Sequence, residues 1–490
     1  MITAWLMAGL LFTPLAWAVL CLLLDFSRGR LVSCLGITVQ VLVSLGLWVA
    51  VAREGGFLYG LGGWEAPLGI ELRVDGLAVT FILLTAIVAG ACGLHASVYL
   101  APDNAWYRYF WPLFWFLWAG LNGVWLGGDL FNLYVGLELL SLSAVGLVAL
   151  GGGINALRAS LRYLLAALLG SMAYLLGVAL MYGQFGTLSI AGIASLLPET
   201  QALVGPGMAM ALMLSGLALK TALFPLHGWL PPAHGIAKSP VSALLSALVV
   251  KASFYIAARL WLEFGHELGS TAVAQLIGGL GGAAVIWGSW LACRQSQLKQ
   301  VVAYSSVAQI GYLFLLFPLT FAVSDTASLQ AQQGMTLQVV SHALAKAAMF
   351  LAAGNLILAT GSHQVAGLAG VSHFLPFSLF SFGLAGVSLM GMPPSGGFAA
   401  KWMLLQASLA SGQWWWIVVL VAGSLLSAAY VFRIYQASFV AKTGVDDFYH
   451  PPGSLEVIPL LLALMSLGLA LVAEPLLSVM ALSLETGGAP

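Results

Sequence analysis

Charged residues are scarce in this chain of 490 residues. Asp, Glu, Lys and Arg together make up 7% of it, whereas hydrophobic residues make up 61%. A water-soluble globular domain carries about 25% charged residues, so this composition excludes that class and predicts a protein that lives in lipid. The formal net charge is zero and no acidic or basic block occurs. This removes the electrostatic signature of a protein that binds nucleic acid.

Clustered cysteines and nucleotide-binding motifs are also lacking. Cys21, Cys34, Cys92 and Cys293 fall in separate segments without a CxxC pair, so neither a disulfide framework nor an iron–sulfur or zinc site is supported. No P-loop is present, and GGGINA at 151–156 lacks the strand, spacing and helix of a dinucleotide-binding turn. We therefore expect no cofactor and no metal, and we interpret the glycines at 151–156 as a tight loop.

Long apolar runs are the main content of the sequence. A run of about twenty residues crosses a ~30 Å hydrocarbon core as a helix. Fourteen such runs lie near 3–24, 31–51, 76–97, 109–128, 130–150, 159–182, 208–229, 240–262, 272–292, 301–323, 336–360, 376–409, 414–440 and 455–480. The first begins without a positive n-region and has no Ala-x-Ala site before Asp25, which predicts a retained span and not a signal peptide. The sequence therefore predicts an all-α polytopic membrane protein.

Basic residues between the runs predict the orientation of the chain. When alternate loops are assigned to opposite sides, one side receives Arg28, Arg30, Arg108, Arg158, Arg162, Lys238, Arg294, Lys299 and Lys442. The other side receives Arg53 and Arg73, while Arg259 lies near a helix end and is ambiguous. Because cytoplasmic loops carry the excess of Lys and Arg, both termini are expected outside the cytoplasm.

Three segments predict local structure of other kinds. Residues 55–76, GGFLYGLGGWEAPLGIELRVDG, are too polar to span, and alternation near Ile70 to Val74 predicts a short hairpin outside the membrane. Residues 187–199, TLSIAGIASLLPE, predict a short interfacial helix. GGLGGAA at 278–284 indicates close helix packing through small residues.

Ionisable residues within the apolar runs are the strongest functional signal. Glu138, Lys220 and Lys251 lie near the centres of three runs, where an ionised side chain costs roughly 2.5–3.5 kcal/mol. A single lysine can reach back to the interface, but these three residues are too central for that to explain all of them. His342 and Lys346 are four apart and share one helical face, although His342 alone is equally well explained as a satisfied core histidine. The pattern predicts a pathway for ions.

Helix breaks accompany two of the lysines. Pro225 follows Lys220 by five residues, and a proline there removes a backbone hydrogen bond, so the helix should kink beside the lysine. MPPSGG at 392–397 interrupts another apolar run just before Lys401. Paired interrupted helices in the two halves of a membrane chain indicate inverted repeats around a polar pathway.

Several other polar residues keep two interpretations. His227 and His234 flank the end of the seventh run, and a structural role at the cytoplasmic surface and a role in proton entry are both open. Asp129 opens the fifth run after two glycines, where N-capping explains it without a transport role. Gln309 is expected to form a hydrogen-bonding bridge to water, and Glu474 stays unassigned.

Six segments together resemble a known family. They are GDLFNLYVGLELLSLSAVGLVAL, LKTALFPLHGWLPPAH, SPVSALLSALVVKASFYIAARL, LKQVVAYSSVAQIGY, SHALAKAAMFLAAGNLI and GMPPSGGFAAKW. They are similar to the successive signatures of the proton-pumping membrane subunits shared by Complex I (NADH-quinone oxidoreductase) and the Mrp-type multisubunit cation/proton antiporters. The resemblance covers about residues 75–440. The short length, the lack of a long C-terminal lateral helix and the hairpin make the chain most similar to the D-type subunit of the Mrp antiporters.

The resemblance implies a fold of about fourteen transmembrane helices. Two five-helix bundles, helices 4–8 and 9–13, would be related by an inverted repeat, with helices 7 and 12 broken. The implied domains are an N-terminal part (1–108) with helices 1–3 and the hairpin, a first proton-channel repeat (109–262), a second repeat (272–440) and a C-terminal helix (441–490).

The resemblance also implies the residues that transfer protons. The family's glutamate on the fifth helix, its lysines on the seventh and eighth helices, its histidine on the eleventh and its charged residue on the twelfth match Glu138, Lys220, Lys251, His342 and Lys401. The sequence departs from the family pattern at PPAH, where many relatives have an acid and this chain has Pro232. That departure leaves the role of this loop in proton entry open, although His234 remains.

We therefore expect a subunit that moves protons along a buried Glu/Lys/His axis in an Mrp-type antiporter that exchanges Na⁺, or K⁺ or Li⁺, for H⁺. Such a subunit would be an ion transporter and not an enzyme by itself, and it would lie in a bacterial inner membrane beside other Mrp-like subunits. Two alternatives stay open. One is a pumping subunit of a Complex I-like enzyme or membrane-bound hydrogenase, and the other is a membrane partner in an inorganic-carbon uptake complex. The sequence does not separate them, because the driving chemistry lies on other chains.

Overall fold

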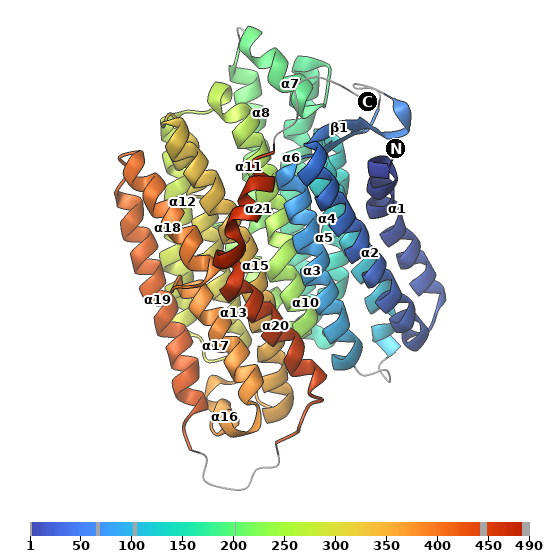
Figure 1. The fold of residues 1–490 in the computed structure, drawn as a ribbon, viewed down its shortest axis with the longest axis vertical. Helices are drawn as coiled ribbons and strands as arrows, with labels where there is room; N and C mark the ends of the chain where they lie inside the picture. The colour runs from blue at the N-terminus through green and yellow to red at the C-terminus, as the bar shows by residue number, and fades with distance from the viewer. Residues whose placement is uncertain (1, 65–68, 101–104, 201, 442–447, 483–490) are drawn as a thin grey trace.

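The computed structural model describes residues 2–64, 69–100, 105–200, 202–441 and 448–482, and within these ranges it is a bundle of helices with one small sheet (Figure 1). The first half contains α1 (Ile2–Leu23), α2 (Phe26–Glu54), β1 (Phe57–Gly60), β2 (Glu71–Val74), α3 (Gly76–Tyr99), α4 (Phe110–Leu126), α5 (Leu130–Ala149), α6 (Gly153–Phe185), α7 (Ile190–Leu196), α8 (Val204–Thr221), α9 (Leu230–Ile236), α10 (Ser239–Leu244) and α11 (Val250–Leu268). The second half contains α12 (Thr271–Arg294), α13 (Leu298–Leu313), α14 (Leu316–Thr320), α15 (Asp325–Thr360), α16 (Val371–Phe374), α17 (Pro376–Met390), α18 (Gly396–Ala410), α19 (Trp415–Ser438), α20 (Ser454–Gly468) and α21 (Ala473–Met480). Short 3₁₀ turns join several of these helices, among them Leu226–Trp229 and Leu469–Val472.

Twelve helical segments in the described part of the chain are long and apolar enough to cross a membrane. They coincide with twelve of the fourteen predicted runs. The run at 109–128 forms α4, which has only 17 residues, and the run at 376–409 is divided into α17 and α18, of 15 residues each. The prediction of an all-α polytopic membrane protein is confirmed.

Both predicted helix breaks are present. α8 ends at Thr221, where Ala222 adopts a left-handed conformation with φ 59°, and a 3₁₀ turn separates it from α9. α17 ends at Met390, where Gly391 has φ 77°. α18 then starts anew, because the Ser395 hydroxyl caps it by accepting a hydrogen bond of 3.1 Å from the Phe398 amide. Each break leaves helix-end carbonyls free for other partners.

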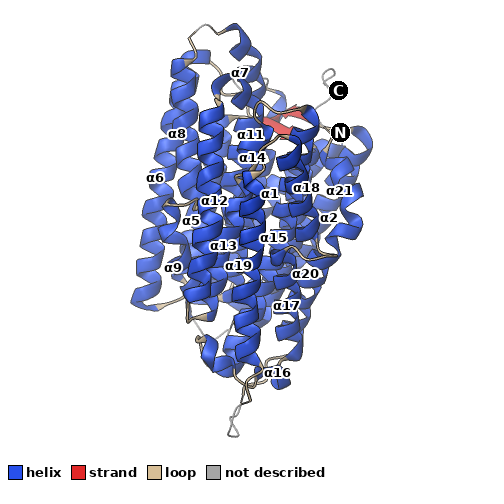
Figure 2. Ribbon diagram, turned by 90° about the vertical axis from the view of Figure 1, so that its left-hand side faces the viewer, coloured by secondary structure: helices blue, strands red, loops and turns tan. Residues whose placement is uncertain are grey.

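The predicted hairpin is confirmed by antiparallel pairing of β1 with β2, from Phe57 opposite Val74 to Gly60 opposite Glu71. It lies at one end of the bundle, which we call the hairpin end (Figure 2). α21 returns to the same end, where the Leu482 carbonyl accepts a 3.1 Å hydrogen bond from Gly76 at the start of α3. The segment at 187–199 forms the short helix α7 at this end, as Figure 1 shows. Lys442, used above for orientation, lies outside the described residues.

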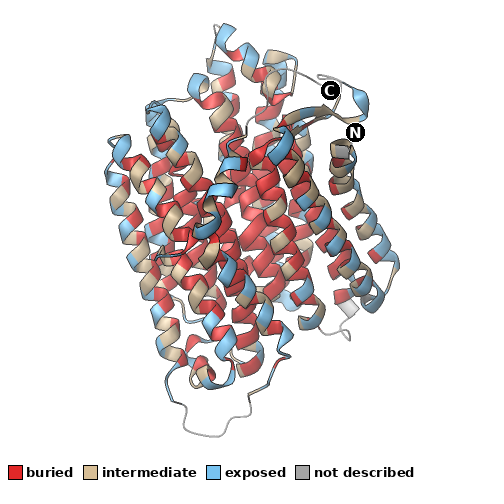
Figure 3. Cartoon of the chain, in the orientation of Figure 1, coloured by how far each residue is buried: buried red, intermediate tan, exposed pale blue. Residues whose placement is uncertain are grey.

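Buried residues occupy the middle of the bundle, whereas the outer faces are exposed (Figure 3) and carry many large apolar side chains. The segments 239–268, 298–320 and 325–360 are the most enclosed, with 100%, 94% and 83% of their most apolar stretches buried. Small residues let α12 approach α13: a Cβ added at Gly281 would lie 2.6 Å from the Gly311 carbonyl oxygen. The packing role predicted for 278–284 is confirmed. These three segments, which carry buried polar residues, therefore lie in the interior, where lipid does not reach them.

Two features differ from the predicted runs. α15 begins at Asp325, eleven residues before the run at 336–360, because Ser324 caps a polar first part that has no apolar signal. Between α10 and α11, residues Leu245–Val249 form a π-helical segment. The apolar run at 240–262 gives no sign of it, since a π turn depends on how neighbouring helices pack.

Candidate functional site

Glu138 of α5, which is half-buried, and Lys220 of α8, which is buried, form an ion pair. Lys220 Nζ lies 3.2 Å from Glu138 Oε1, and the two side chains are 19% exposed for Glu138 and 4% for Lys220. Lys220 also donates a 2.8 Å hydrogen bond to the Ser141 hydroxyl, and Glu138 accepts one from Ser171 of α6. The structure thus brings together two residues predicted from separate runs. Because little water reaches them, each charge depends strongly on the other.

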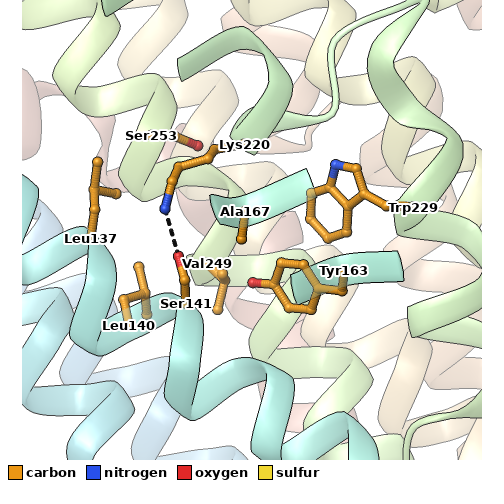
Figure 4. A pocket seen from close by; sticks show the side chains of 9 residues that line it. All are labelled: Leu137, Leu140, Ser141, Tyr163, Ala167, Lys220, Trp229, Val249 and Ser253. Carbon is orange, nitrogen blue, oxygen red and sulfur yellow. Dashed lines mark hydrogen bonds between the residues drawn. The ribbon is translucent and has the colours of Figure 1, made fainter. Parts of the chain in front are cut away.

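A small cavity adjoins this pair. Its volume of about 10 Å³ is enough for roughly one water molecule. Figure 4 shows the Lys220 amine and the Ser141 hydroxyl beside the ring of Tyr163, which stacks on Trp229 at 4.4 Å. Polar groups at its wall make the cavity suitable for a water molecule that bridges neighbouring groups.

Lys251 of α11 is the next buried lysine. It is 1% exposed, and its amine donates to the main-chain carbonyl of Ser246, which lies in the π segment. π segments inside α-helices occur frequently at functional sites. A hydrogen bond of 2.9 Å from the Thr221 hydroxyl to the Ser253 hydroxyl joins α8 to α11. Polar contacts therefore continue from the neighbour of Lys220 to the helix of Lys251.

The second half of the chain continues these contacts through α13. The hydroxyl oxygens of Ser246 and Ser306 are 2.8 Å apart. Lys346 of α15, fully buried, donates to the Ser305 hydroxyl and, at 3.0 Å, to the Val302 carbonyl. α13 thus places one hydroxyl against the π segment that holds Lys251 and another against Lys346.

His342 lies one turn from Lys346 on α15 and is 1% exposed. Within the described part of the chain, neither of its ring nitrogens has a hydrogen-bond partner. A satisfied core histidine would have one, so the alternative considered for His342 finds no support. An unpaired buried polar group is costly, so both ring nitrogens are left for partners such as water.

Lys401 of α18 lies against the broken end of α17. Its amine donates to the carbonyls of Leu389 at 2.8 Å and Met390 at 3.2 Å. It also donates to Ser424 at 3.0 Å and lies 4.6 Å above the ring centre of Tyr312. The carbonyls are available because α17 stops at this point. The break therefore supplies the acceptors that hold the buried lysine.

Gln309 of α13 connects this region to the rest of the site. It donates to the Leu389 carbonyl at 3.2 Å and accepts from Gln338 at 3.0 Å. The side-chain amide of Gln309 is therefore hydrogen-bonded to protein groups on both sides. Its bridge to water stays a prediction. The hydroxyls of Ser341 and Ser388, 2.8 Å apart, link α15 to α17.

We call six groups the polar axis: Glu138, Lys220, Lys251, His342, Lys346 and Lys401. They come from α5, α8, α11, α15 and α18. Hydroxyl contacts join α8 to α11, the π segment to α13, α13 to α15, and α15 to α17. All six were predicted from the sequence. Lys299 was missed as a buried group: its amine donates to the Ala237 carbonyl in the interior, although a lysine between two runs gives no sequence signal of burial.

The secondary candidates fall into different settings. His234 is fully buried, not at a surface, and stacks on Phe350 with ring centres 5.3 Å apart. His227 is half-buried in the 3₁₀ turn after α8. Asp129 caps α5 by accepting a 2.8 Å hydrogen bond from the Asn132 amide, so the N-cap interpretation is confirmed. Glu474 is exposed in the first turn of α21.

A second ionic cluster lies at the hairpin end. Asp75 accepts hydrogen bonds from Arg259 of α11 and, at 2.9 Å, from Arg73 of β2, which also pairs with Glu263. Burial alone would raise the pKa of Asp75, but the Arg259 guanidinium outweighs it and lowers the pKa to about 2. Burial raises the pKa of nearby Glu71 above its ordinary value. No local sequence pattern predicts this pair, because Asp75 and Arg259 are 184 residues apart.

These features define a polytopic helical membrane protein with a row of buried ionisable side chains. A family model described as NADH:quinone oxidoreductase/Mrp antiporter, TM, matches residues 127–427. The chain belongs to this family of membrane subunits, as its motifs predicted.

Individual relatives come from both branches of the family. The chain is 36% identical over 417 residues to NADH-quinone oxidoreductase subunit N of Desulforudis audaxviator, covering 85% of this chain and 81% of that protein. It is 30% identical over 455 residues to the D-type subunit of the Na(+)/H(+) antiporter of Alkalihalophilus pseudofirmus, covering 92% and 90%. A chain of the Mrp complex from Dietzia sp. DQ12-45-1b has the same fold, with a TM-score of 0.89 at 24% identity and coverage of 98% and 96%.

Proposed function

We propose that this chain is the proton-translocating subunit of a multisubunit monovalent cation (Na⁺)/H⁺ antiporter. The observation that carries the proposal is the polar axis, in which an ion pair of a half-buried carboxylate with a buried lysine is followed by three further buried lysines and a buried histidine. Buried ionisable groups in a membrane protein indicate a pathway for ions or protons. The antiporter branch is favoured because the alignment with the D-type relative spans 92% of this chain and 90% of that relative.

The proposal assigns each group a role in proton transfer. Burial disfavours the charged form of any lysine, and a nearby carboxylate favours it. While Glu138 stays next to Lys220, the lysine keeps its proton. When the pair opens, Lys220 passes a proton through water and hydroxyls toward Lys251, and the proton then moves by way of His342 and Lys346 to Lys401. His227 and His234 are proposed to serve proton entry.

The proposed architecture counts α4 and the broken pair α17–α18 as crossings in addition to the twelve long helices. Residues 109–262 and 272–440 then form two inverted repeats, each with one broken helix, between an N-terminal part at 1–108 and a C-terminal part at 441–490. Both termini lie outside the cytoplasm of a bacterial inner membrane. Other Mrp-like subunits are the proposed partners.

A second candidate function is proton pumping in a Complex I-like redox enzyme. It is supported by the 36% identity to a subunit N of NADH-quinone oxidoreductase. The same polar axis serves both functions, since it moves protons whatever drives them. The two differ in the partner chains, which supply either cation exchange or electron transfer.

The experiment is to purify the tagged chain with its native partners, identify them by mass spectrometry and measure Na⁺-dependent collapse of a pH gradient in everted vesicles. Lys251→Leu should abolish this exchange, whereas Cys92→Ala, at another buried helix position, should leave it unchanged. Partners with flavin and iron–sulfur cofactors, together with no Na⁺ response, would refute the antiporter assignment. Equal loss in both variants would instead refute the charge relay, because general fragility of packing would explain it.

A further inference from the structure

A row of polar side chains leads away from the polar axis along α11. Lys251, Tyr255, Arg259 and Glu263 are four residues apart, so they lie on one face of the helix. Two turns, or about 12 Å of helix rise, separate Lys251 from Arg259. Lys251, Tyr255 and Arg259 are all buried, and α11 ends near β1 (Figure 1). This face therefore connects the middle of the polar axis to the hairpin end.

Arg259 lies in this row next to Tyr255 and bonds both Tyr255 and Asp75. Its two terminal nitrogens donate to the two carboxylate oxygens of Asp75, and Nη2 also donates to the Tyr255 hydroxyl at 2.8 Å. That hydroxyl in turn donates to the Trp125 carbonyl at 2.8 Å. The rings of Tyr255, Phe81 and Trp125 form a triangle in which each ring centre lies 4.8–5.0 Å from the other two. Between Lys251 and Arg259 the row is thus narrow and lined by aromatic rings.

The ion pair has a defined direction. Arg259 bonds Tyr255, which is one turn nearer to Lys251, so the guanidinium faces the polar axis. Asp75 directly follows β2 and bonds Arg73 of that strand, so the carboxylate faces the hairpin. A guanidinium keeps its proton at physiological pH. A fixed positive charge in a narrow passage excludes protons and other cations.

We propose that Arg259, held in place by Asp75, is a fixed-charge barrier that stops protons from leaving the polar axis at Lys251 toward the hairpin end. The inference rests on the proposed passage of protons through Lys251. A proton that escaped along α11 would bypass His342 and Lys401, and its movement would no longer be coupled to the rest of the axis. A lone unit charge about 12 Å away would change such a passage by about tenfold at an effective dielectric constant of ~20, and the adjacent Asp75 carboxylate offsets part of this effect.

The test is passive proton entry into vesicles that contain the purified complex, driven by a membrane potential in the absence of the exchanged cation. Asp75→Asn/Arg259→Gln removes both charges without leaving one of them buried alone. This variant should raise the proton leak severalfold, by less than the about tenfold effect of a lone charge, whereas Arg259→Lys keeps the charge and should leak no more than the wild type. An unchanged leak in the double variant, with normal amounts of complex, would overturn the barrier.

A matched control distinguishes the effect of the Arg259 charge from the effect of disturbed hairpin packing. Arg73→Gln/Glu263→Gln removes the neighbouring pair but leaves Arg259 in place, and its leak should equal that of the wild type. If both double variants leak equally, the cluster only holds the hairpin, and the proposal is wrong. Adding Lys251→Leu to the leaky variant should abolish the leak, and a leak that survives this change also overturns the proposal.

A titratable variant keeps the test informative if the neutral pair does not assemble. Arg259→His should be tight at low pH and should leak as the pH rises through about 6.5, where an imidazole loses its charge. A leak that is independent of pH would refute the role of charge. The proposed function fails on a different measurement. If Lys251→Leu alone retains cation/proton exchange, the proposed function is wrong, whatever the proton leak of the Arg259 variants.

Discussion

Loss of the Glu138 charge should have the largest effect of any single change at the first ion pair. At the observed distance of 3.2 Å, two unit charges attract by about 5 kcal/mol at an effective dielectric constant of ~20. Glu138→Gln keeps the shape and removes this attraction. Because 1.36 kcal/mol corresponds to a factor of ten, the balance between charged and neutral Lys220 should move by more than three orders of magnitude.

The matched comparison is Ser141→Ala, which removes the other partner of the Lys220 amine at 2.8 Å. A hydrogen bond from a charged donor contributes about 1.5 kcal/mol net at the low end of its range, so exchange should fall by only about tenfold. Glu138→Gln should reduce exchange by about a hundredfold or more if opening and closing of the pair controls the proton. The assay is the initial rate of Na⁺-dependent pH change in everted vesicles, normalised to the amount of chain in the membrane.

Assembly is the necessary control, because removal of one partner from a buried pair can destabilise a protein by about 3–5 kcal/mol. Glu138→Gln/Lys220→Gln removes both charges and should restore the amount of protein without restoring exchange. The reasoning is refuted if Glu138→Gln, assembled at normal levels, exchanges as fast as Ser141→Ala. In that case the pair would be structural only.

Two other predictions concern the far lysine and the hairpin end. Lys401→Ala should abolish exchange, and Lys401→Glu should keep part of it, since a carboxylate can also carry a proton there. A cysteine that replaces Lys401 should react faster with a small membrane-permeant thiol reagent than a cysteine that replaces Leu384. Equal labelling at the two positions would argue against a hydrated cavity beside Lys401. Asp75→Asn should lower the Tm of the complex equally at pH 7 and pH 5. The pKa of Asp75 in the folded protein, about 2, lies below its pKa in the unfolded chain. The stability that the ion pair contributes is therefore fully present above the unfolded-state pKa and is lost as the pH falls through about 2. A Tm difference that shrinks at pH 5 would contradict this assignment.

Local sequence signals predicted the helices, their breaks and the ionisable groups. The lysines stand out because charge is rare in apolar runs, and Pro225 and the glycines at 392–397 act on the backbone of their own helix. These signals need no knowledge of distant contacts. The same reasoning could not show that the end of α17 supplies the acceptors for Lys401, because that contact depends on how α18 folds back.

Contacts between distant segments were beyond the sequence. The pair of Arg259 with Asp75 joins residues 184 positions apart, and no local pattern in either segment points to the other. The hydroxyls of Ser246 and Ser306 are likewise ordinary small residues until α13 packs beside the π segment. Serines and threonines are common in membrane helices for packing reasons, so their positions carry no signal until the neighbouring helix is known.

The polar axis is electrostatically uneven along its length, and this unevenness suggests where it is controlled. Among the described residues, Lys220 is the one lysine with a carboxylate within ion-pair distance. Lys251, Lys346 and Lys401 have carbonyl and hydroxyl acceptors instead. Dipoles of this kind hold a cation without neutralising it, so each of these lysines remains sensitive to the charge of the next in a medium of low dielectric constant. A movement that separates Glu138 from Lys220 would therefore be felt along the whole series, and the ion pair is the point at which partner subunits could most effectively act.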